Sequence, residues 1–120
     1  MTNPRPGSIE ALLISWSIHL RAANLAPRTI DNYMLGGQQL AAHLGAGTPV
    51  SEIERADIEG YIIAKTAETT ASTAATRYRG LQQFFRWLTD EGEITSDPFA
   101  RMRPPKVEER EIPVIGVADL

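Results

Sequence analysis

Side chains that could bind a negatively charged group are concentrated between Thr70 and Trp87, in the stretch TASTAATRYRGLQQFFRW. Small hydroxyl residues begin the stretch, and Arg77, Arg79 and Arg86 follow them. Arginine presents a rigid fork of donors, and the free N–H groups at the start of a helix also favour anions. These residue types at helical spacing therefore predict an anionic ligand.

Common catalytic and metal-binding patterns are missing from the sequence. There is no glycine-rich phosphate loop, no metal-spaced set of His, Asp and Glu, and no Ser-His-Asp or Cys-His order. His19 and His43 each stand without a second ligand nearby, so we expect surface or packed histidines. Tyr33, Tyr61 and Tyr78 occupy apolar positions and are expected in the core. We therefore expect no catalysis, cofactor or metal from these residues.

Charge is unevenly distributed along the chain. The 120 residues carry 12 Lys and Arg against 15 Asp and Glu, and this net charge of −3 argues mildly against a nucleic-acid partner. However, residues 70–106 carry six basic and four acidic side chains, whereas residues 45–69 carry two basic and five acidic ones. Local basic surface governs affinity for phosphate, so the segment values matter more than the total.

The absence of three sequence signals predicts a compartment. The chain has no cysteine, which suits a reducing environment. No apolar run approaches the roughly 20 residues of a membrane span, and the N-terminus lacks the apolar core of a signal peptide. We therefore expect a cytoplasmic protein without a membrane partner.

Four stretches space their apolar residues as amphipathic helices do. Ser8 is a good N-cap for the first, and Pro27 fits the first turn of the second. The predicted helices run from Ser8 to Asn24, from Pro27 to Leu44, from Arg55 to Thr66 and from the hydroxyl run at 69–73 to Asp90. The side chains expected on their apolar faces are Ile9, Leu12, Leu13, Trp16, Leu20, Ile30, Leu40, Ala41, Leu44, Ile58, Tyr61, Ile62, Ala74, Tyr78, Leu81, Phe84, Phe85, Trp87 and Leu88, with either Tyr33 or Met34.

The pair Gly36-Gly37 interrupts the second helix, where each glycine costs about 1 kcal/mol relative to alanine. Close approach of a neighbouring helix is the usual compensation, and we expect it here. Setting Thr29 over Thr73 also aligns Gly36 to Leu40 with Gly80 to Phe84, both of the form Gly-x-Gln-Gln-apolar. This echo indicates either two pseudo-symmetric helices or a coincidence.

Beyond the fourth helix the sequence predicts a turn and an extended segment. Asp97-Pro98-Phe99 is typical of a turn, and Phe99 is expected to fold back onto the core. Residues 102–107 cannot form a helix because of Pro104 and Pro105.

Taken in order, three segments resemble the N-terminal core-binding domain of tyrosine recombinases, the phage-integrase family. They are LAPRTIDNYMLGGQQLAAHL, SEIERADIEGYI and TASTAATRYRGLQQFFRWLTDEGEITSDPFARMRPPK. The match covers about residues 8–107, and it depends on the order and spacing of the pieces more than on any one of them. The residues that carry it are Pro27, Thr29, Tyr33, Ile53, Asp57, Ile58, Tyr61, Ile62, Thr70, Thr73, Arg77, Phe84, Phe85, Trp87, Leu88, Glu91-Gly92, Asp97-Pro98-Phe99 and Pro105-Lys106.

The resemblance implies an all-α fold, a four-helix SAM-like bundle of two crossed helical hairpins. Residues 1–7 would form a flexible arm and residues 8–103 the core-binding domain. Residues 104–120 would form an extended linker and the start of a missing catalytic domain.

The resemblance also implies a role in recombination. In this family the domain forms half of a clamp around duplex DNA, with its second and fourth helices approaching the major groove. A downstream catalytic domain carries the tyrosine that forms a 3′-phosphotyrosyl link, so this chain itself is not expected to be an enzyme. The implied partners are double-stranded DNA and other recombinase protomers, which assemble as tetramers.

The two helices implied in DNA contact both begin with hydroxyl residues. Their free N–H groups would hold phosphates, arginine and glutamine can read guanine and adenine, and Ser and Thr more often hold the backbone. For any one arginine the alternative is an ordinary solvated charge. The candidate DNA-binding residues are Arg28, Thr29, Ser72, Thr73, Arg77, Arg79, Gln83, Arg86 and Lys106.

One departure from the family pattern weakens the expected affinity. Residues 34–37 read Met-Leu-Gly-Gly where the family tends to carry basic or polar residues. We expect weak binding with about 3 to 5 phosphate contacts and a salt slope of about −3 to −4.5. The alternative hypothesis is a helical protein-interaction module, which would use Met34, Leu35 and the glycine pair to dock a partner helix.

Overall fold

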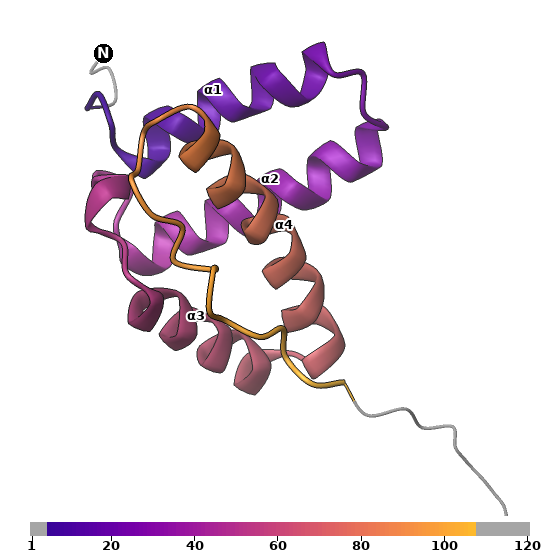
Figure 1. Ribbon diagram of the computed structural model, residues 1–120. Coiled ribbons are helices and arrows are strands. Elements are labelled where there is room, and N and C mark those ends of the chain that lie inside the picture. The colour runs from indigo at the N-terminus through magenta and orange to yellow at the C-terminus, as the bar shows by residue number, and fades with distance from the viewer. Residues whose placement is uncertain (1–4, 108–120) are drawn as a thin grey trace, which may run out of the picture.

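The computed structural model describes residues 5–107, and within that range the fold is all-helical (Figure 1). It contains four α-helices and one short 3₁₀ turn, and a single isolated bridge pairs Ser8 with Pro49. The predicted all-α class is confirmed, and α3 continues two residues beyond the predicted end at Thr66. The elements are α1 (Ile9–Ala22), α2 (Pro27–Leu44), η1 (Val50–Glu52), α3 (Arg55–Glu68) and α4 (Ala71–Asp90).

Local signals in the sequence account for where the helices begin. The Ser8 hydroxyl accepts a hydrogen bond from the backbone N–H of Ala11 at 3.1 Å and caps α1. Pro27 is the first residue of α2, where its missing N–H costs nothing. The Thr70 hydroxyl accepts from the N–H of Thr73 at 3.0 Å and caps α4.

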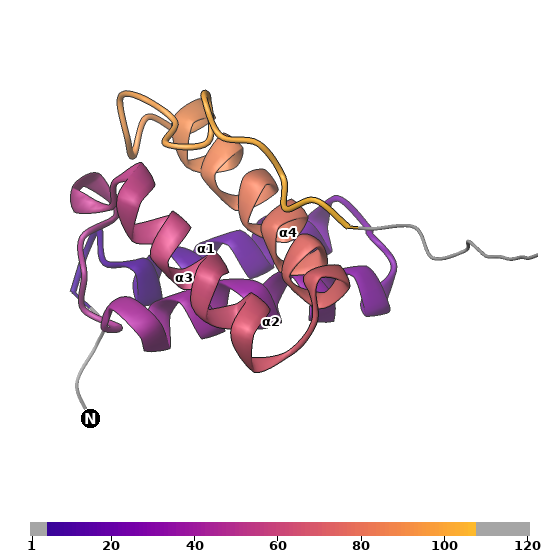
Figure 2. The same cartoon turned by 90° about the horizontal axis from the view of Figure 1, so that it is seen from below.

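The helices form two hairpins that pack crosswise (Figure 1). After a turn in which Asn24 has a φ of 60°, α2 runs back alongside α1. α3 and α4 form the second hairpin, and α4 packs mainly against α2, which it crosses. Figure 2 shows the same arrangement from below. This is the crossed pair of hairpins that the resemblance implies.

Glycines allow the helices of this bundle to approach closely. A Cβ at Gly37 would overlap Leu13 Cδ2 of α1, and a Cβ at Gly36 would lie 3.5 Å from the Arg77 carbonyl oxygen of α4. At Gly80 a Cβ would lie 3.3 Å from Tyr33 Cδ1. The expectation of a close neighbour at the glycine pair is therefore confirmed.

The contacts at this crossing also bear on the internal echo. Gly36 of α2 faces residue 77 of α4, and Gly80 of α4 faces residue 33 of α2. In the alignment of Thr29 with Thr73, residue 36 corresponds to 80 and residue 33 to 77. The two contacts therefore exchange under the repeat, as a local two-fold arrangement requires.

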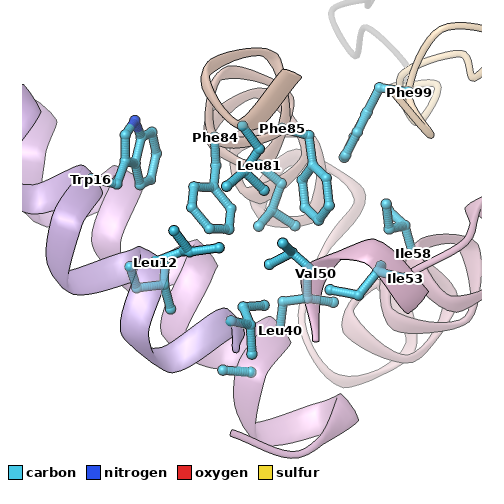
Figure 3. Close-up of a cluster of buried hydrophobic side chains, with 14 of the residues drawn as sticks. Leu12, Trp16, Leu40, Val50, Ile53, Ile58, Leu81, Phe84, Phe85 and Phe99 are labelled. Carbon is cyan, nitrogen blue, oxygen red and sulfur yellow. The ribbon is translucent and has the colours of Figure 1, made fainter. Parts of the chain in front are cut away.

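The core lies where the two hairpins meet and is rich in aromatic side chains (Figure 3). Trp16 packs against Phe84 with ring centroids 4.9 Å apart, and Phe84 packs edge-on against Phe85 at 5.3 Å. Val50 of η1 and the following Ile53 are buried in the same cluster. The predicted faces are confirmed, except that some members are only partly buried: Ile30, Tyr33, Met34, Leu44, Ile62 and Trp87.

The chain beyond α4 returns along the domain. Gly92, with a φ of 79°, follows the helix, and Ile94 and Phe99 are buried. The Phe99 ring lies 5.1 Å from that of Tyr78 and 5.4 Å from that of Phe85, which confirms its predicted return to the core. Residues 102–107 then run without regular structure toward the N-terminal end of α4, visible in both views (Figures 1 and 2).

Both predicted terminal segments lie partly outside the described residues. Of the predicted arm at 1–7, only residues 5–7 are described, and the Gly7 carbonyl accepts a hydrogen bond from the N–H of Val50 at 3.0 Å. Of the predicted linker at 104–120, only residues 104–107 are described. No helix within residues 5–107 is long and apolar enough to cross a lipid bilayer.

Candidate nucleic-acid interface

One polar stripe of α4 carries four of the candidate residues. Ser72, Arg79, Gln83 and Arg86 are spaced by seven, four and three residues, which places them on one side of a helix with 3.6 residues per turn. Ser72, Arg79 and Arg86 are exposed and Gln83 is half-buried. From Ser72 to Arg86 the stripe extends roughly 21 Å along the helix axis. It is long enough to follow several successive phosphates or base edges.

Arg77 lies on a different side of α4, where the helix crosses α2. Its Nε donates a hydrogen bond to Oε1 of Gln39 at 3.2 Å, and the side chain is half-buried. Its stem passes beside Gly36, where a Cβ would lie 3.6 Å from Arg77 Cδ. Thr73, one turn earlier, shares this side of the helix.

The N-terminus of α2 presents open donors. Ala26 stands at the N-cap and no side chain caps the helix. Within residues 5–107 the backbone N–H groups of Arg28 and Thr29 have no hydrogen-bond partner. Arg28 is exposed and Thr29 is half-buried, so an anion could reach this end of the helix.

The N-terminus of α4 is already partly satisfied. Thr70 accepts from the Thr73 N–H and donates to the Thr73 hydroxyl at 3.1 Å. Thr73 is therefore part of the cap as well as a candidate contact. Ser72 makes no side-chain hydrogen bond as a donor within the described residues, and its hydroxyl stays available.

The helix starts that carry candidate residues can be located in the ribbon views. In Figure 1 the N-terminal ends of α2 and α4 both lie on the right, that of α2 above and that of α4 below, and residues 102–107 end beside the start of α4 (Figures 1 and 2). Lys106 is exposed. The two helix starts thus lie on the same side of the domain at separate levels, and residues 102–107 end next to the start of α4.

Charge separates along the domain. Within residues 5–107 the ion pairs are Arg55 with Glu59 and Lys65 with Glu68, so none of the α4 arginines is neutralised by a carboxylate. Arg79 Nη2 lies 3.4 Å from the Thr76 hydroxyl. Glu54 and Glu93 instead line a pocket of about 390 Å³ where α3 begins and the chain leaves α4. In that pocket the two carboxylates stand with one arginine, Arg55, so this acidic end of the domain is less favourable for an anion than the α4 arginines, which are unpaired among the described residues.

Most of the chain matches the sequence model of a known family. Residues 12–93 match the model of the phage integrase, N-terminal SAM-like domain. The chain belongs to this family. The resemblance noted from the three sequence segments is confirmed, and so is the SAM-like fold it implies.

Known relatives of this SAM-like domain are recombinases and integrases. Tyrosine recombinase XerD of Ralstonia nicotianae is 30% identical over 110 residues, which cover 85% of this chain and 35% of that protein. A lambda integrase (75–356) dimer bound to a COC′ core site superposes with a TM-score of 0.76 at 23% identity, over 86% of this chain and 37% of the other.

Two further structures share the fold. A lambda integrase tetramer bound to a Holliday junction gives a TM-score of 0.76 at 24% identity, over 86% of this chain and 30% of that one. The integrase from mycobacterium phage Brujita gives 0.70 at 22% identity, over 85% and 34%. The chain thus spans about a third of the length of these relatives.

Sequence reasoning about this SAM-like domain missed Gln39. Its Oε1 accepts from Arg77 Nε and also from the Tyr61 hydroxyl at 3.1 Å, so one amide oxygen joins α2, α3 and α4. Burial raises the pKa of Tyr61 above its usual 10.0, and the nearby Arg77 partly opposes that rise. No local signal could have identified the partner, because Gln39 and Arg77 are 38 residues apart.

The tyrosines of the SAM-like domain pack in or against the core, and its two histidines lie at the surface. Tyr61 and Tyr78 are buried, as predicted, and Tyr33 is half-buried with its ring stacked 5.7 Å from that of Trp16. His19 and His43 are exposed. Within residues 5–107 no group of three or more His, Asp or Glu is placed to hold a metal ion.

Proposed function

We propose that this SAM-like domain is the core-binding half of a site-specific tyrosine recombinase or integrase. It clamps duplex DNA at the recombination site through α2 and α4. A catalytic domain elsewhere in the parent protein cleaves and rejoins strands through a phosphotyrosine. In this proposal residues 8–103 are the DNA-binding domain, residues 104–120 lead to the catalytic domain, and other protomers complete a tetramer on DNA.

The observation that carries the proposal is that candidate donors on α2 and α4 are exposed and have no carboxylate partner among the described residues. Arg79 and Arg86 project from the α4 stripe without carboxylate partners among the described residues, and Arg28 lies at an uncapped helix start. Phosphate contacts supply most of the affinity of DNA-binding proteins, and helix starts and arginines are their usual donors. The DNA-bound lambda integrase structures that share this fold support the same role.

Within this proposal the candidate residues have separate tasks. Arg28, Thr29, Ser72 and Thr73 hold the sugar-phosphate backbone at the two helix tips. The α4 stripe residues enter the groove, where Arg79, Gln83 or Arg86 reads base edges. Lys106 binds a phosphate as the clamp closes.

Part of the docking face that the protein-interaction alternative requires is covered by the domain itself. Gly36 and Gly37 are buried, covered by Arg77 and Leu13 of the same domain, and are not open to a partner helix. Of the docking face only Met34, which is half-buried, and Leu35, which is exposed, are left.

Fluorescence anisotropy with the whole chain tests the proposal. A duplex carrying inverted repeats is compared with a scrambled duplex of equal length, for the wild type and the Arg79→Ala and Arg86→Ala variants. We expect tighter binding to the repeats, and a roughly tenfold loss for each variant because each deletes a charged hydrogen-bond donor. Arg55→Ala is the matched control, since it removes the same charge at the acidic end where Arg55 pairs with Glu59. Equal binding by all four proteins would refute the assigned surface.

A further inference from the structure

Three helices are joined at a single oxygen atom where α4 crosses α2. The hydroxyl of Tyr61 on α3 donates to Oε1 of Gln39 on α2 at 3.1 Å, and Nε of Arg77 on α4 donates to the same atom at 3.2 Å. Tyr61 is only 2% exposed, while Gln39 and Arg77 are half-buried.

The chemistry of these groups fixes their orientation. A guanidinium has donors only, so the Gln39 side chain must present its oxygen, not its nitrogen, to Arg77. The Tyr61 hydroxyl can both donate and accept, and facing the same oxygen it must donate. Each partner therefore restricts the rotamer of the next, from the buried ring of Tyr61 outward to Arg77.

Arg77 is anchored at one edge and open at the other. Its Nε is occupied by Gln39, and within residues 5–107 its Nη1 and Nη2 make no hydrogen bond and no ion pair. Its stem lies beside Gly36, where a Cβ would stand 3.6 Å from Arg77 Cδ, an ordinary contact distance. A guanidinium held in this way keeps the planar pair of nitrogens with which arginine grips a phosphate.

The other polar side chains around Tyr61 make no hydrogen bond or ion pair with Arg77 among the described residues. Lys65 lies 5.8 Å over the Tyr61 ring, but its ammonium is paired with Glu68 at 3.3 Å. His43 packs edge-on against Tyr61 with ring centroids 5.7 Å apart. These three side chains line, with Gln39 and Tyr61, a pocket of about 290 Å³ between α2 and α3.

We infer that Gln39 and Tyr61 are positioning residues, which hold the Arg77 guanidinium in place to bind one backbone phosphate of the duplex. The inference rests on the proposed function. Fixing the arginine before binding reduces the conformational entropy lost when the phosphate is bound, and this raises the affinity. Gln39 therefore contributes to affinity without contacting the phosphate. Neither Gln39 nor Tyr61 needs to touch DNA.

A double-mutant cycle distinguishes positioning from a purely structural role. Duplex affinity is measured by anisotropy for the wild type, Gln39→Leu, Arg77→Ala and the double variant, under conditions where circular dichroism shows each to be folded. We expect about a tenfold loss and a salt slope smaller by about 0.9 for Arg77→Ala. Gln39→Leu is expected to lose about fivefold in the wild-type background and to have no effect once Arg77 is alanine. Equal losses from Gln39→Leu in both backgrounds, or no loss in either, would overturn the inference.

Tyrosine substitutions provide a second test that leaves the packing intact. Tyr61→Phe removes only the hydroxyl that bonds to Gln39, and we expect about a twofold weaker Kd. Tyr78→Phe is the matched control, because the buried Tyr78 hydroxyl has no hydrogen-bond partner among the described residues. Indistinguishable affinities for Tyr61→Phe and Tyr78→Phe would count against positioning by Tyr61.

Arg79→Ala separates a failure of this inference from a failure of the proposed function. If the wild type binds no duplex, or if Arg79→Ala binds as well as the wild type, the proposed function fails and the inference fails with it. If Arg79→Ala weakens binding while Arg77→Ala does not, the interface stands and only the role given to Gln39, Tyr61 and Arg77 is wrong.

Discussion

Replacing Gly37 by alanine tests the close helix packing most sharply, and Gly36→Ala is its matched control. Both residues lie in the middle of α2, where alanine is favoured over glycine by about 1 kcal/mol. A Cβ at Gly37 would overlap Leu13 Cδ2, and Leu13 is buried. A Cβ at Gly36 would meet Arg77 atoms at 3.5 and 3.6 Å, which is ordinary contact.

The difference between the two variants isolates the packing cost, because the gain in helix propensity is common to both. Forcing a methyl group into a packed core costs about 1 to 3 kcal/mol. We therefore expect Gly36→Ala to be about 1 kcal/mol more stable than the wild type, and Gly37→Ala to fall about 2 kcal/mol below Gly36→Ala. For a domain of this size the latter difference corresponds to roughly 10 °C in Tm.

Urea unfolding followed by far-ultraviolet circular dichroism provides the measurement, with an unchanged m value as the check on two-state behaviour. Gly80→Ala should fall between the two, because its Cβ would press on Tyr33 Cδ1 at 3.3 Å and on Tyr33 Cα at 3.4 Å. Identical midpoints for Gly36→Ala and Gly37→Ala would show that α1 does not close on α2 as described.

Three further substitutions test the caps, the returning segment and the buried hydroxyls. Thr70→Ala removes the α4 cap and should lower the unfolding free energy by about 1 kcal/mol. The control Thr95→Ala, at an exposed position outside the helices, should change it by less than about 0.5 kcal/mol. Equal effects of the two substitutions in urea unfolding would argue against the cap. Phe99→Ala should lower the unfolding free energy by about 3 to 5 kcal/mol. A loss below about 1 kcal/mol would show that this segment does not pack in the core as described. Tyr78→Phe should leave the unfolding free energy unchanged or raise it by about 1 kcal/mol, because it removes a buried hydroxyl that has no hydrogen-bond partner among the described residues. Burial raises the pKa of Tyr61 and Tyr78 above 10.0, so unfolding releases protons in alkali, and wild-type stability should fall as the pH rises past about 10. The Tyr61→Phe/Tyr78→Phe double variant should lose less stability than the wild type between about pH 9 and pH 11, and a parallel decline would contradict the shifts.

Much of the fold was predictable because local chemistry determines it. Helical spacing of large apolar residues identified the buried sides of all four helices, and the hydroxyl of Ser8 marked a helix start. The glycine pair predicted a close neighbour because its helix-propensity cost needs compensation. Phe99 was predictable as an isolated aromatic residue after a turn, too large to leave in water.

The interface was less predictable, because it depends on contacts between distant residues. The arginines of α4 are candidates from their type and spacing alone, and their contact with DNA stays a prediction. The sequence did not reveal that Arg77 is bound to Gln39 and that Tyr61 shares the same acceptor. Side-chain hydrogen bonds across a helix crossing have no local signature, and they require the crossing geometry that the glycines create. The same holds for Thr73, whose place in the α4 cap becomes clear only from Thr70.

The dependence of duplex affinity on salt tests the central claim most directly. Anisotropy titrations of the whole chain between about 50 and 200 mM salt give the slope of log K against log salt concentration, which counts the phosphates contacted. With about 3 to 5 phosphate contacts the slope should be about −3 to −4.5. In Arg79→Ala the slope should become smaller by about 0.9 if Arg79 binds a phosphate, and it should stay unchanged if Arg79 reads a base. A slope near zero, or no binding to any duplex at the lowest salt, would contradict the account of this domain as a DNA clamp.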